Sequence, residues 1–215
     1  MKRLSSLSFR RSSKYEVMLL GNAAVGKSSL LLRFASDMAP SPSQITPTIG
    51  AEFKVKTISL PNRVVRLKIW DTSGQKRFKD VLSTYYYRCT GAIIVYDIQS
   101  RESFEEAMDW VVELREKTST GMVIVLAGNK ADMEANRVIT KNEAEEFAAL
   151  HNLIFMETSC VSGMNVHNCF VELANVIQSE VDEKDSRTKK VKGSSHGKWS
   201  CWCITGSSPE LNKTK

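Results

Sequence analysis

Long apolar segments are missing from this sequence. No run approaches the roughly 20 apolar residues that a helix needs to cross a bilayer. The opening MKRLSSLSFRR also lacks the continuous apolar stretch of a secretory signal, so we expect a protein on the cytosolic side. Because this opening is rich in Arg and Ser without an acid, it also fits a mitochondrial transit peptide, but we prefer a disordered arm.

A disulfide framework is missing as well. The five cysteines are Cys89, Cys160, Cys169, Cys201 and Cys203. Their spacing forms no disulfide framework, and a cytosolic chain would keep them reduced. A metal site of His196 with the last two cysteines would have only three ligands at an unfamiliar spacing, which disfavours it.

Acidic residues are nearly absent from the two ends of the chain. Residues 1–14 carry five basic and no acidic residues, and residues 187–215 carry seven basic and one acidic. Subtracting the +5 and +6 of these ends from the overall +6 leaves about −5 for the middle. A domain that docks onto nucleic acid needs its basic residues on its own surface, so we expect no nucleic-acid partner. The ends are either solvated arms or attractors for acidic membrane surfaces.

The middle of the chain alternates short apolar segments with helical patterns. Strands are expected at residues 15–20, 64–69, 92–96, 123–127 and 154–156, and helices at 28–34, 101–117, 141–150 and 166–180. This alternation predicts an α/β fold with a mainly parallel sheet. Thr140 with Glu143 forms a capping box at the start of one helix.

The chain is long enough for one domain with tails. Its 215 residues, 42% of them hydrophobic, suffice for one core. Residues 182–198 are charged and lose helical periodicity. We therefore expect a flexible basic arm over residues 1–14, a folded domain over 15–180, and a flexible basic tail over 181–215.

The segment GNAAVGKS, Gly21 to Ser28, fits the pattern G-x-x-x-x-G-K-[ST] and lies between an expected strand and an expected helix. Backbone N–H groups of such a loop converge on phosphates, and the following helix directs its positive end at the same charge. Lys27 adds a cation, and the Ser28 hydroxyl suits Mg²⁺. The candidate phosphate-binding residues are Gly21, Ala23, Ala24, Val25, Gly26, Lys27, Ser28 and Ser29.

A phosphate loop alone allows kinases, ATPases and GTPases, so the base must be identified elsewhere. The segment GNKAD, residues 128–132, follows an expected strand. The Asp132 carboxylate can accept from both the ring N–H and the exocyclic amine of guanine, a donor pair that adenine lacks. A nucleotide kinase should instead lack N-K-x-D and carry an Arg-rich lid.

Three further motifs complete a family pattern: TPTIG at Thr46–Gly50, WDTSGQKRF at Trp70–Phe78, and ETS at Glu157–Ser159. With them, about residues 15–180 resemble small GTPases of the Ras superfamily, most closely the Rab family and its early-endosomal subfamily. The resemblance implies a doubly wound, mostly parallel six-stranded sheet with helices on both faces, a P-loop small G domain.

The resemblance also implies roles for individual residues. Asn129 and Asp132 would read guanine, the Lys130 stem would pack on the base, and backbone N–H groups of Ser159, Cys160 and Val161 would contact it. Mg²⁺ would be held by Ser28, by Thr48 and, through water, by Asp71. The Gly74 N–H would meet the γ-phosphate, and Gln75 would orient the attacking water.

The implied function is a GTP/GDP switch that hydrolyses GTP slowly, because no internal arginine finger is assured. An exchange factor, an activating protein and effectors would bind through Thr46–Gly50 and Trp70–Phe78. We expect a monomer that is cytoplasmic and peripheral on the cytosolic face of endosomal or other vesicle membranes. The alternative is a divergent nucleotide-binding scaffold with little or no turnover.

The chain departs from the family at several positions. Ala39, beside Met38, stands where relatives have an aromatic residue that stacks on guanine, which predicts GDP release several-fold faster. Cys160 and Val161 replace Ala and Lys, and Ser73 replaces Ala next to Gly74. The segment between Phe34 and Thr48 is about two residues longer than in early-endosomal Rabs.

The tail departs from the family too. Rab tails usually end in a cysteine pair for prenyl groups, whereas Cys201 and Cys203 are followed by twelve residues ending in Lys215. Acylation of Cys201 or Cys203, with the preceding lysines as a second membrane signal, is the alternative that we retain.

Overall fold

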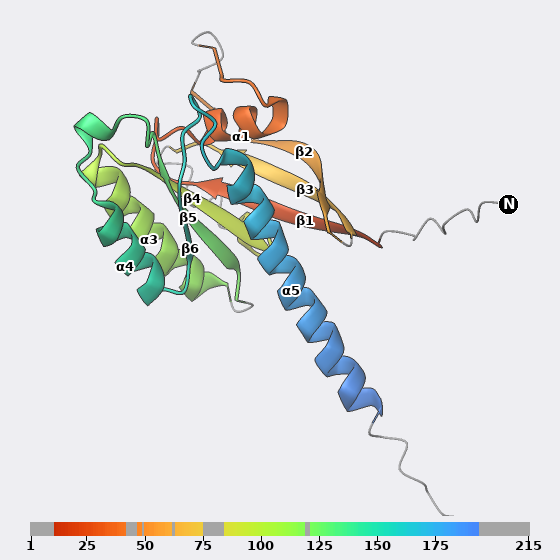
Figure 1. The fold of residues 1–215 in the computed structure, drawn as a ribbon. Helices are drawn as coiled ribbons and strands as arrows, with labels where there is room; N and C mark the ends of the chain where they lie inside the picture. The colour runs from red at the N-terminus through yellow and green to blue at the C-terminus, as the bar shows by residue number, and fades with distance from the viewer. Residues whose placement is uncertain are drawn as a thin grey trace, which may run out of the picture. The chain divides into compact units, whose positions relative to one another are not determined.

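Six strands form the centre of the computed structural model, which describes residues 11–41, 47–48, 50–61, 63–74, 84–118 and 121–193 (Figure 1). The strands are β1 (Arg11–Leu20), β2 (Ala51–Leu60), β3 (Arg63–Thr72), β4 (Gly91–Asp97), β5 (Val123–Asn129) and β6 (Ile154–Glu157). The helices are α1 (Lys27–Ser36), α3 (Arg101–Lys117), α4 (Lys141–Leu150) and α5 (Val166–Gly193), with the short 3₁₀ helix η3 (Glu134–Asn136) before α4.

The sheet has the order β2-β3-β1-β4-β5-β6. Only the β2–β3 pair is antiparallel, and the other four neighbouring pairs are parallel. The strand order reverses between β1 and β4, and in sheets of this kind ligands bind where the carboxyl ends of the strands diverge. The predicted mostly parallel six-stranded α/β fold is confirmed.

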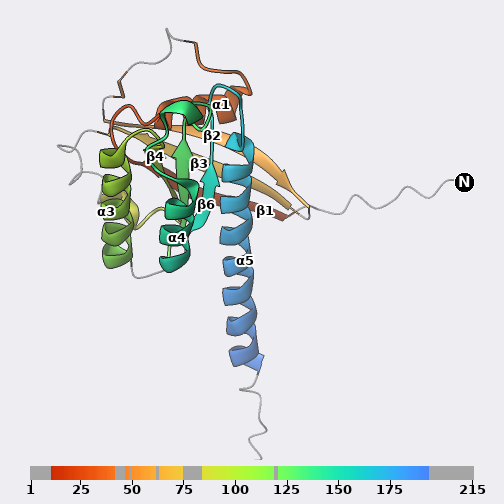
Figure 2. The same cartoon turned by 60° about the vertical axis from the view of Figure 1, so that its left-hand side comes forward.

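Helices pack against the sheet through apolar stripes. Phe104, Val111 and Leu114 of α3 join a buried cluster with Met18 and Leu20 of β1, and α3 lies beside α4 in both views (Figures 1 and 2). A second contact joins α1 to α5, where the rings of Phe34 and Phe170 stack 4.0 Å apart. A side chain at Gly91 in β4 would meet Leu173 and Ile177 of α5, which places this part of α5 against the sheet.

Strand β1 begins earlier than expected. Arg11 to Leu19 pair in register with residues 63–71 of β3, so residues 11–14 belong to the sheet and not to an arm. Backbone pairing does not require apolar side chains. The strand therefore extends over polar residues that precede the apolar segment, which begins at Tyr15. The hydroxyls of Ser13 and Tyr15 both donate to Gln178 of α5, at 2.8 and 2.6 Å. Residues 1–10 lie outside the described residues.

Helix α5 continues to Gly193, beyond the expected end near residue 180. Lys184 pairs with Glu180 and Arg187 pairs with Glu183, each at the i,i+4 spacing that supports a solvated helix. The expected tail from residue 181 therefore begins as a helix over residues 181–193. The chain divides into two units, residues 1–179 and residues 180–215, and the boundary falls within α5.

No helix among the described residues is long and apolar enough to cross a membrane.

Candidate nucleotide-binding site

A cavity of about 740 Å³ opens at the carboxyl ends of the central strands. Thirteen predicted site residues line it: Ala23, Ala24, Gly26, Lys27, Ser28, Ser29, Thr48, Gly74, Asn129, Lys130, Asp132, Cys160 and Val161. Segments far apart in the sequence thus meet around one space. The predicted residues Gly21, Val25, Asp71 and Ser159 are not among the lining residues.

The phosphate loop connects β1 to α1, and its backbone has the left-handed conformations that a tight loop needs. Gly26 has φ +100°, and a Cβ there would collide with the Asn129 amide nitrogen. A glycine is therefore required both for the turn and for the close approach to β5.

Lys27, the first residue of α1, is only 5% exposed and folds back over the loop. Its Nζ donates to the carbonyls of Gly21 and Asn22, at 2.9 and 2.7 Å. Burial lowers the pKa of Lys27 to about 8, and the carboxylate of Asp71 acts in the opposite direction. The Lys27 ammonium and the positive N-terminus of α1 lie at the same point. A phosphate bound there would be attracted by both.

Three oxygen-bearing side chains converge beside this lysine. The hydroxyls of Ser28 and Thr48 lie 2.7 Å apart, and Thr48 donates to Asp71 Oδ2 at 3.4 Å. Asp71 is 8% exposed, and its Oδ1 has no hydrogen-bond partner among the described residues. Burial raises the pKa of Asp71 above its ordinary value. Hard oxygen donors with an unused buried carboxylate oxygen fit Mg²⁺.

Asn129, at the end of β5, connects the phosphate loop to the segment that follows β6. Its side-chain amide N–H donates to the carbonyl of Val25 at 2.8 Å, linking β5 to the phosphate loop. Its Oδ1 accepts from the Thr158 hydroxyl at 3.2 Å and from the Cys160 thiol at 3.5 Å. Asn129 is 2% exposed, so these bonds hold its amide in one orientation.

Lys130 takes up a left-handed conformation, with φ +63°. Its Nζ forms an ion pair with Asp97 Oδ2 at 2.7 Å. Asp97 Oδ1 in turn accepts from the backbone and the side chain of Gln99, at 3.0 and 3.3 Å. The ion pair anchors the head of Lys130 at the end of β4, and Lys130 is one of the residues that line the cavity.

The segment after β6 forms the remaining wall. Cys160 is buried, and burial raises the pKa of its thiol to about 11. Val161 is 69% exposed although it lines the cavity. The replacements of Ala and Lys therefore differ in effect: Cys160 adds a contact to Asn129, whereas the wide exposure of Val161 leaves this wall open to solvent.

Six lining residues were not among the candidate nucleotide-binding or metal residues: Pro40, Pro47, Thr72, Ser73, Gln99 and Met133. Pro47, Thr72 and Ser73 do lie within the two predicted switch segments. Gln99 follows the carboxyl end of β4. Because ligands bind at these ends of the strands in sheets of this kind, its position after an expected strand is a signal that could have found it. Pro40, rather than its neighbour Ala39, lines the cavity, and only the folded path of residues 35–41 could have revealed this.

Several predicted residues lie outside the described residues. They are Gln75, Thr46, Cys201 and Cys203. Of the two predicted switch segments, the structure describes residues 47, 48 and 50 in the first and 70–74 in the second.

The fold and the cavity together define a P-loop nucleotide-binding protein. The family model described as "Ras family" matches residues 16–179. Among similar proteins, RABA4b of Arabidopsis thaliana is 42% identical over 80% of this chain and 75% of its own length. Rab-4A of Danio rerio is 42% identical over 78% of each chain. Rab-5A of Dictyostelium discoideum is 45% identical over 75% of this chain and 79% of its own length.

The chain belongs to the Ras family, and its relatives place it among the Rab small GTPases. The predicted family is confirmed. The protein is therefore a GTPase and a switch of Rab-type traffic.

Proposed function

We propose that the cavity binds GTP and GDP together with Mg²⁺, and that GTP hydrolysis releases the segments around Thr48 and Gly74. The observation that carries this proposal is the convergence of Ser28, Thr48 and Asp71 beside Lys27. A metal held by these three groups would neutralise the β- and γ-phosphates. When the γ-phosphate leaves, the segment that carries Thr48 loses one of its anchors.

Hydrolysis is slow in this proposal and depends on Gln75, which orients the attacking water. An activating protein supplies an arginine worth about 10³ to 10⁵ in rate, and an exchange factor opens the site for nucleotide release. The scaffold alternative, with little or no turnover, is disfavoured because Lys27, Ser28, Thr48 and Gln75 are all present.

The test of turnover is single-turnover hydrolysis of GTP loaded onto the parent protein and onto Gln75→Leu. We expect the variant to hydrolyse GTP at least about tenfold more slowly. Its GDP release should match the parent's, which serves as the control for an intact site. Equal hydrolysis rates would remove Gln75 from the mechanism, and a parent that binds GTP without any turnover would favour the scaffold.

Effectors are proposed to bind beside the switch segments, on an aromatic cluster of Phe53 in β2, Trp70 in β3 and Tyr85. The ring of Phe53, which is 53% exposed, lies 5.2 Å from that of Trp70, and Trp70 lies 5.1 Å from Tyr85. Lys68 Nζ sits 4.8 and 4.2 Å from the rings of Phe53 and Trp70. Trp70 and Tyr85 are partly buried against the core, which leaves Phe53 as the exposed ring of the cluster. Aromatic rings that cluster at a surface are typical anchors of protein interfaces. Trp70 directly precedes Asp71 in the sequence, so nucleotide state and effector affinity would be coupled.

The protein is proposed to act as a monomer, peripherally on the cytosolic face of endosomal or other vesicle membranes. The G domain would end near residue 180, and the basic tail, with acylation at Cys201 or Cys203, would supply the membrane contact.

A further inference from the structure

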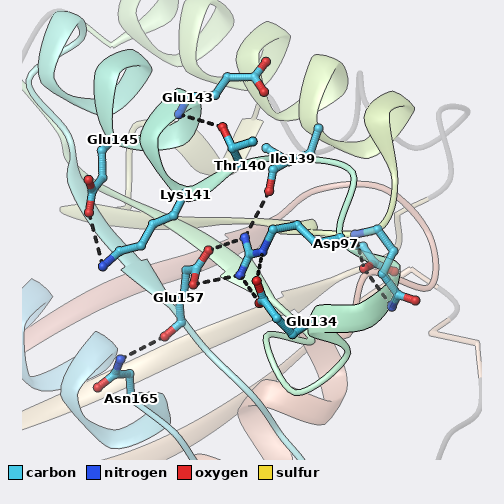
Figure 3. A network of polar contacts seen from close by, with 11 residues as sticks. Asp97, Glu134, Ile139, Thr140, Lys141, Glu143, Glu145, Glu157 and Asn165 are labelled. Atoms are coloured by element: carbon cyan, nitrogen blue, oxygen red, sulfur yellow. Dashed lines mark hydrogen bonds and ion pairs between the residues drawn. The ribbon is translucent and has the colours of Figure 1, made fainter.

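Arg137 joins two segments that surround the base side of the cavity, without lining the cavity itself. Its Nη1 and Nη2 donate to the two carboxylate oxygens of Glu157, at 2.6 and 3.1 Å. Its Nε and Nη2 donate to Glu134 at 2.8 and 2.6 Å, and Nη1 also donates to the carbonyl of Ile139 at 3.0 Å. In Figure 3 the dashed lines from the labelled residues Glu134, Glu157 and Ile139 meet at one side chain.

The two carboxylates that pair with Arg137, those of Glu157 and Glu134, differ in their exposure to solvent. The side chains of Arg137 and Glu157 are only 15% and 13% exposed, whereas that of Glu134 is 68% exposed. Glu134 first, and Glu157 second, raise the pKa of Arg137 above its ordinary value, so the guanidinium stays charged. An exposed pair contributes little to structure, but a largely buried forked pair holds its two segments firmly.

One of the joined segments starts at Asn129 and Lys130, contains Asp132, and reaches Arg137. It is attached at its far end where the backbone N–H groups of Val138 and Ile139 donate to the carbonyl of Ile98, at 2.9 and 3.0 Å. The Arg137 ion pair therefore closes the segment into a loop whose two ends are both fixed to the sheet.

The other segment runs from Glu157 to Val161. Ala131 N–H donates to the Thr158 carbonyl at 3.1 Å, and Thr158 N–H donates to the Gly128 carbonyl at 2.8 Å. The side-chain amide of Asn165 donates to the Glu157 carbonyl at 2.9 Å. Backbone hydrogen bonds thus join the two segments near the cavity, and the ion pair of Arg137 with Glu157 joins them a second time.

We infer that Arg137 is a positioning residue for guanine recognition: its pair with Glu157 sets the spacing between Asp132 on one segment and Cys160 on the other. This inference rests on the proposed binding of guanine nucleotides. A base that must touch both segments is bound tightly only when their spacing is fixed, so loss of the pair speeds release and weakens discrimination between bases.

The test compares release of GDP and of inosine diphosphate from the full-length parent and from Arg137→Gln. Inosine lacks the exocyclic amine that Asp132 is expected to accept from. We expect Arg137→Gln to release GDP about tenfold faster and to lose most of the parent's preference for GDP over inosine diphosphate. Hydrolysis of prebound GTP should change little, because the phosphate end of the site keeps its contacts.

Two variants serve as controls. Arg101→Gln removes another forked ion pair, with Glu143, which joins α3 to α4 at residues that do not line the cavity. Glu134→Gln removes only the exposed partner of Arg137. Both should keep the parent's release rate and base preference. If Arg137→Gln fails to fold, Arg137→Lys, which keeps the charge without the fork, should show the same change to a smaller extent.

Glu157→Gln completes a double-mutant cycle. We expect it to match Arg137→Gln, and the double variant to release GDP no faster than either single variant. Additive effects, an equal acceleration of both nucleotides, or an unchanged Arg137→Gln would each overturn the inference. A parent that binds no guanine nucleotide would instead refute the proposed function, on which the inference rests.

Discussion

Tyr96 carries a hydroxyl that the described core leaves without a hydrogen-bond partner. The residue is fully buried in β4, and its ring packs edge-on against Phe104 at 4.9 Å. An unsatisfied buried hydroxyl costs about 1–3 kcal/mol. We therefore expect Tyr96→Phe to leave the free energy of unfolding unchanged or to raise it by about 1 kcal/mol, as measured by urea denaturation.

Tyr86→Phe is the matched control for Tyr96→Phe. Tyr86 is also buried, but its hydroxyl donates to Glu113 at 3.2 Å, so its removal should lower the free energy of unfolding. If Tyr96→Phe destabilised the protein as much as Tyr86→Phe, the Tyr96 hydroxyl would have a partner after all.

The thiol of Cys160 should react slowly although it lines the cavity. Its pKa of about 11 leaves far less thiolate at pH 8 than an ordinary thiol with a pKa near 8.5. We expect alkylation by iodoacetamide at pH 8 to be at least about a hundredfold slower than for glutathione, and to accelerate as pH rises toward 11. Mass spectrometry of the peptide containing Cys160 measures this, with the urea-unfolded protein as the control. A native rate equal to the unfolded rate would mean that burial does not protect the thiol.

At the scale of elements, a hydrogen bond to the side chain of Thr140 caps the N-terminus of helix α4 and contributes to its stability. The Thr140 hydroxyl accepts from the Glu143 N–H at 3.2 Å, as the expected capping box requires. The Glu143 carboxylate, however, forms its ion pair with Arg101 of α3. We expect Thr140→Ala to lower the free energy of unfolding by about 1 kcal/mol, measured by urea denaturation. Thr140→Ser, which keeps the hydroxyl, should stay close to the parent, and an unchanged Thr140→Ala would show that the cap contributes nothing.

The elements differ in how well sequence patterns predict them. Helices α3 and α4 have the predicted bounds because apolar residues recur along them at helical spacing between clear ends. Strand β2 was not among the apolar segments, since six of its first seven residues are exposed on this edge strand. The length of α5 was underestimated for a related reason: charged residues can continue a helix through ion pairs that an apolar pattern does not record.

At the scale of the whole molecule, local motifs predicted most of the cavity wall, because the phosphate loop and the N-K-x-D segment each carry their chemistry in consecutive residues. The links between them were not predictable. Lys130 pairs with Asp97 and Arg137 pairs with Glu157 across 33 and 20 residues of sequence. No local pattern marks such partners, and only the parallel sheet brings the ends of β4, β5 and β6 together.

The central claim is that Lys27, Ser28, Thr48 and Asp71 form one site for a guanine nucleotide and Mg²⁺. The most direct measurement is stopped-flow release of fluorescent GDP from the purified protein, in Mg²⁺ and in excess chelator. We expect tight binding in Mg²⁺ and release at least about tenfold faster once the metal is removed, because the phosphates then lose the ion that joins them to Ser28 and Asp71. Release that is indifferent to the chelator, or no binding of GDP at all, would contradict the account.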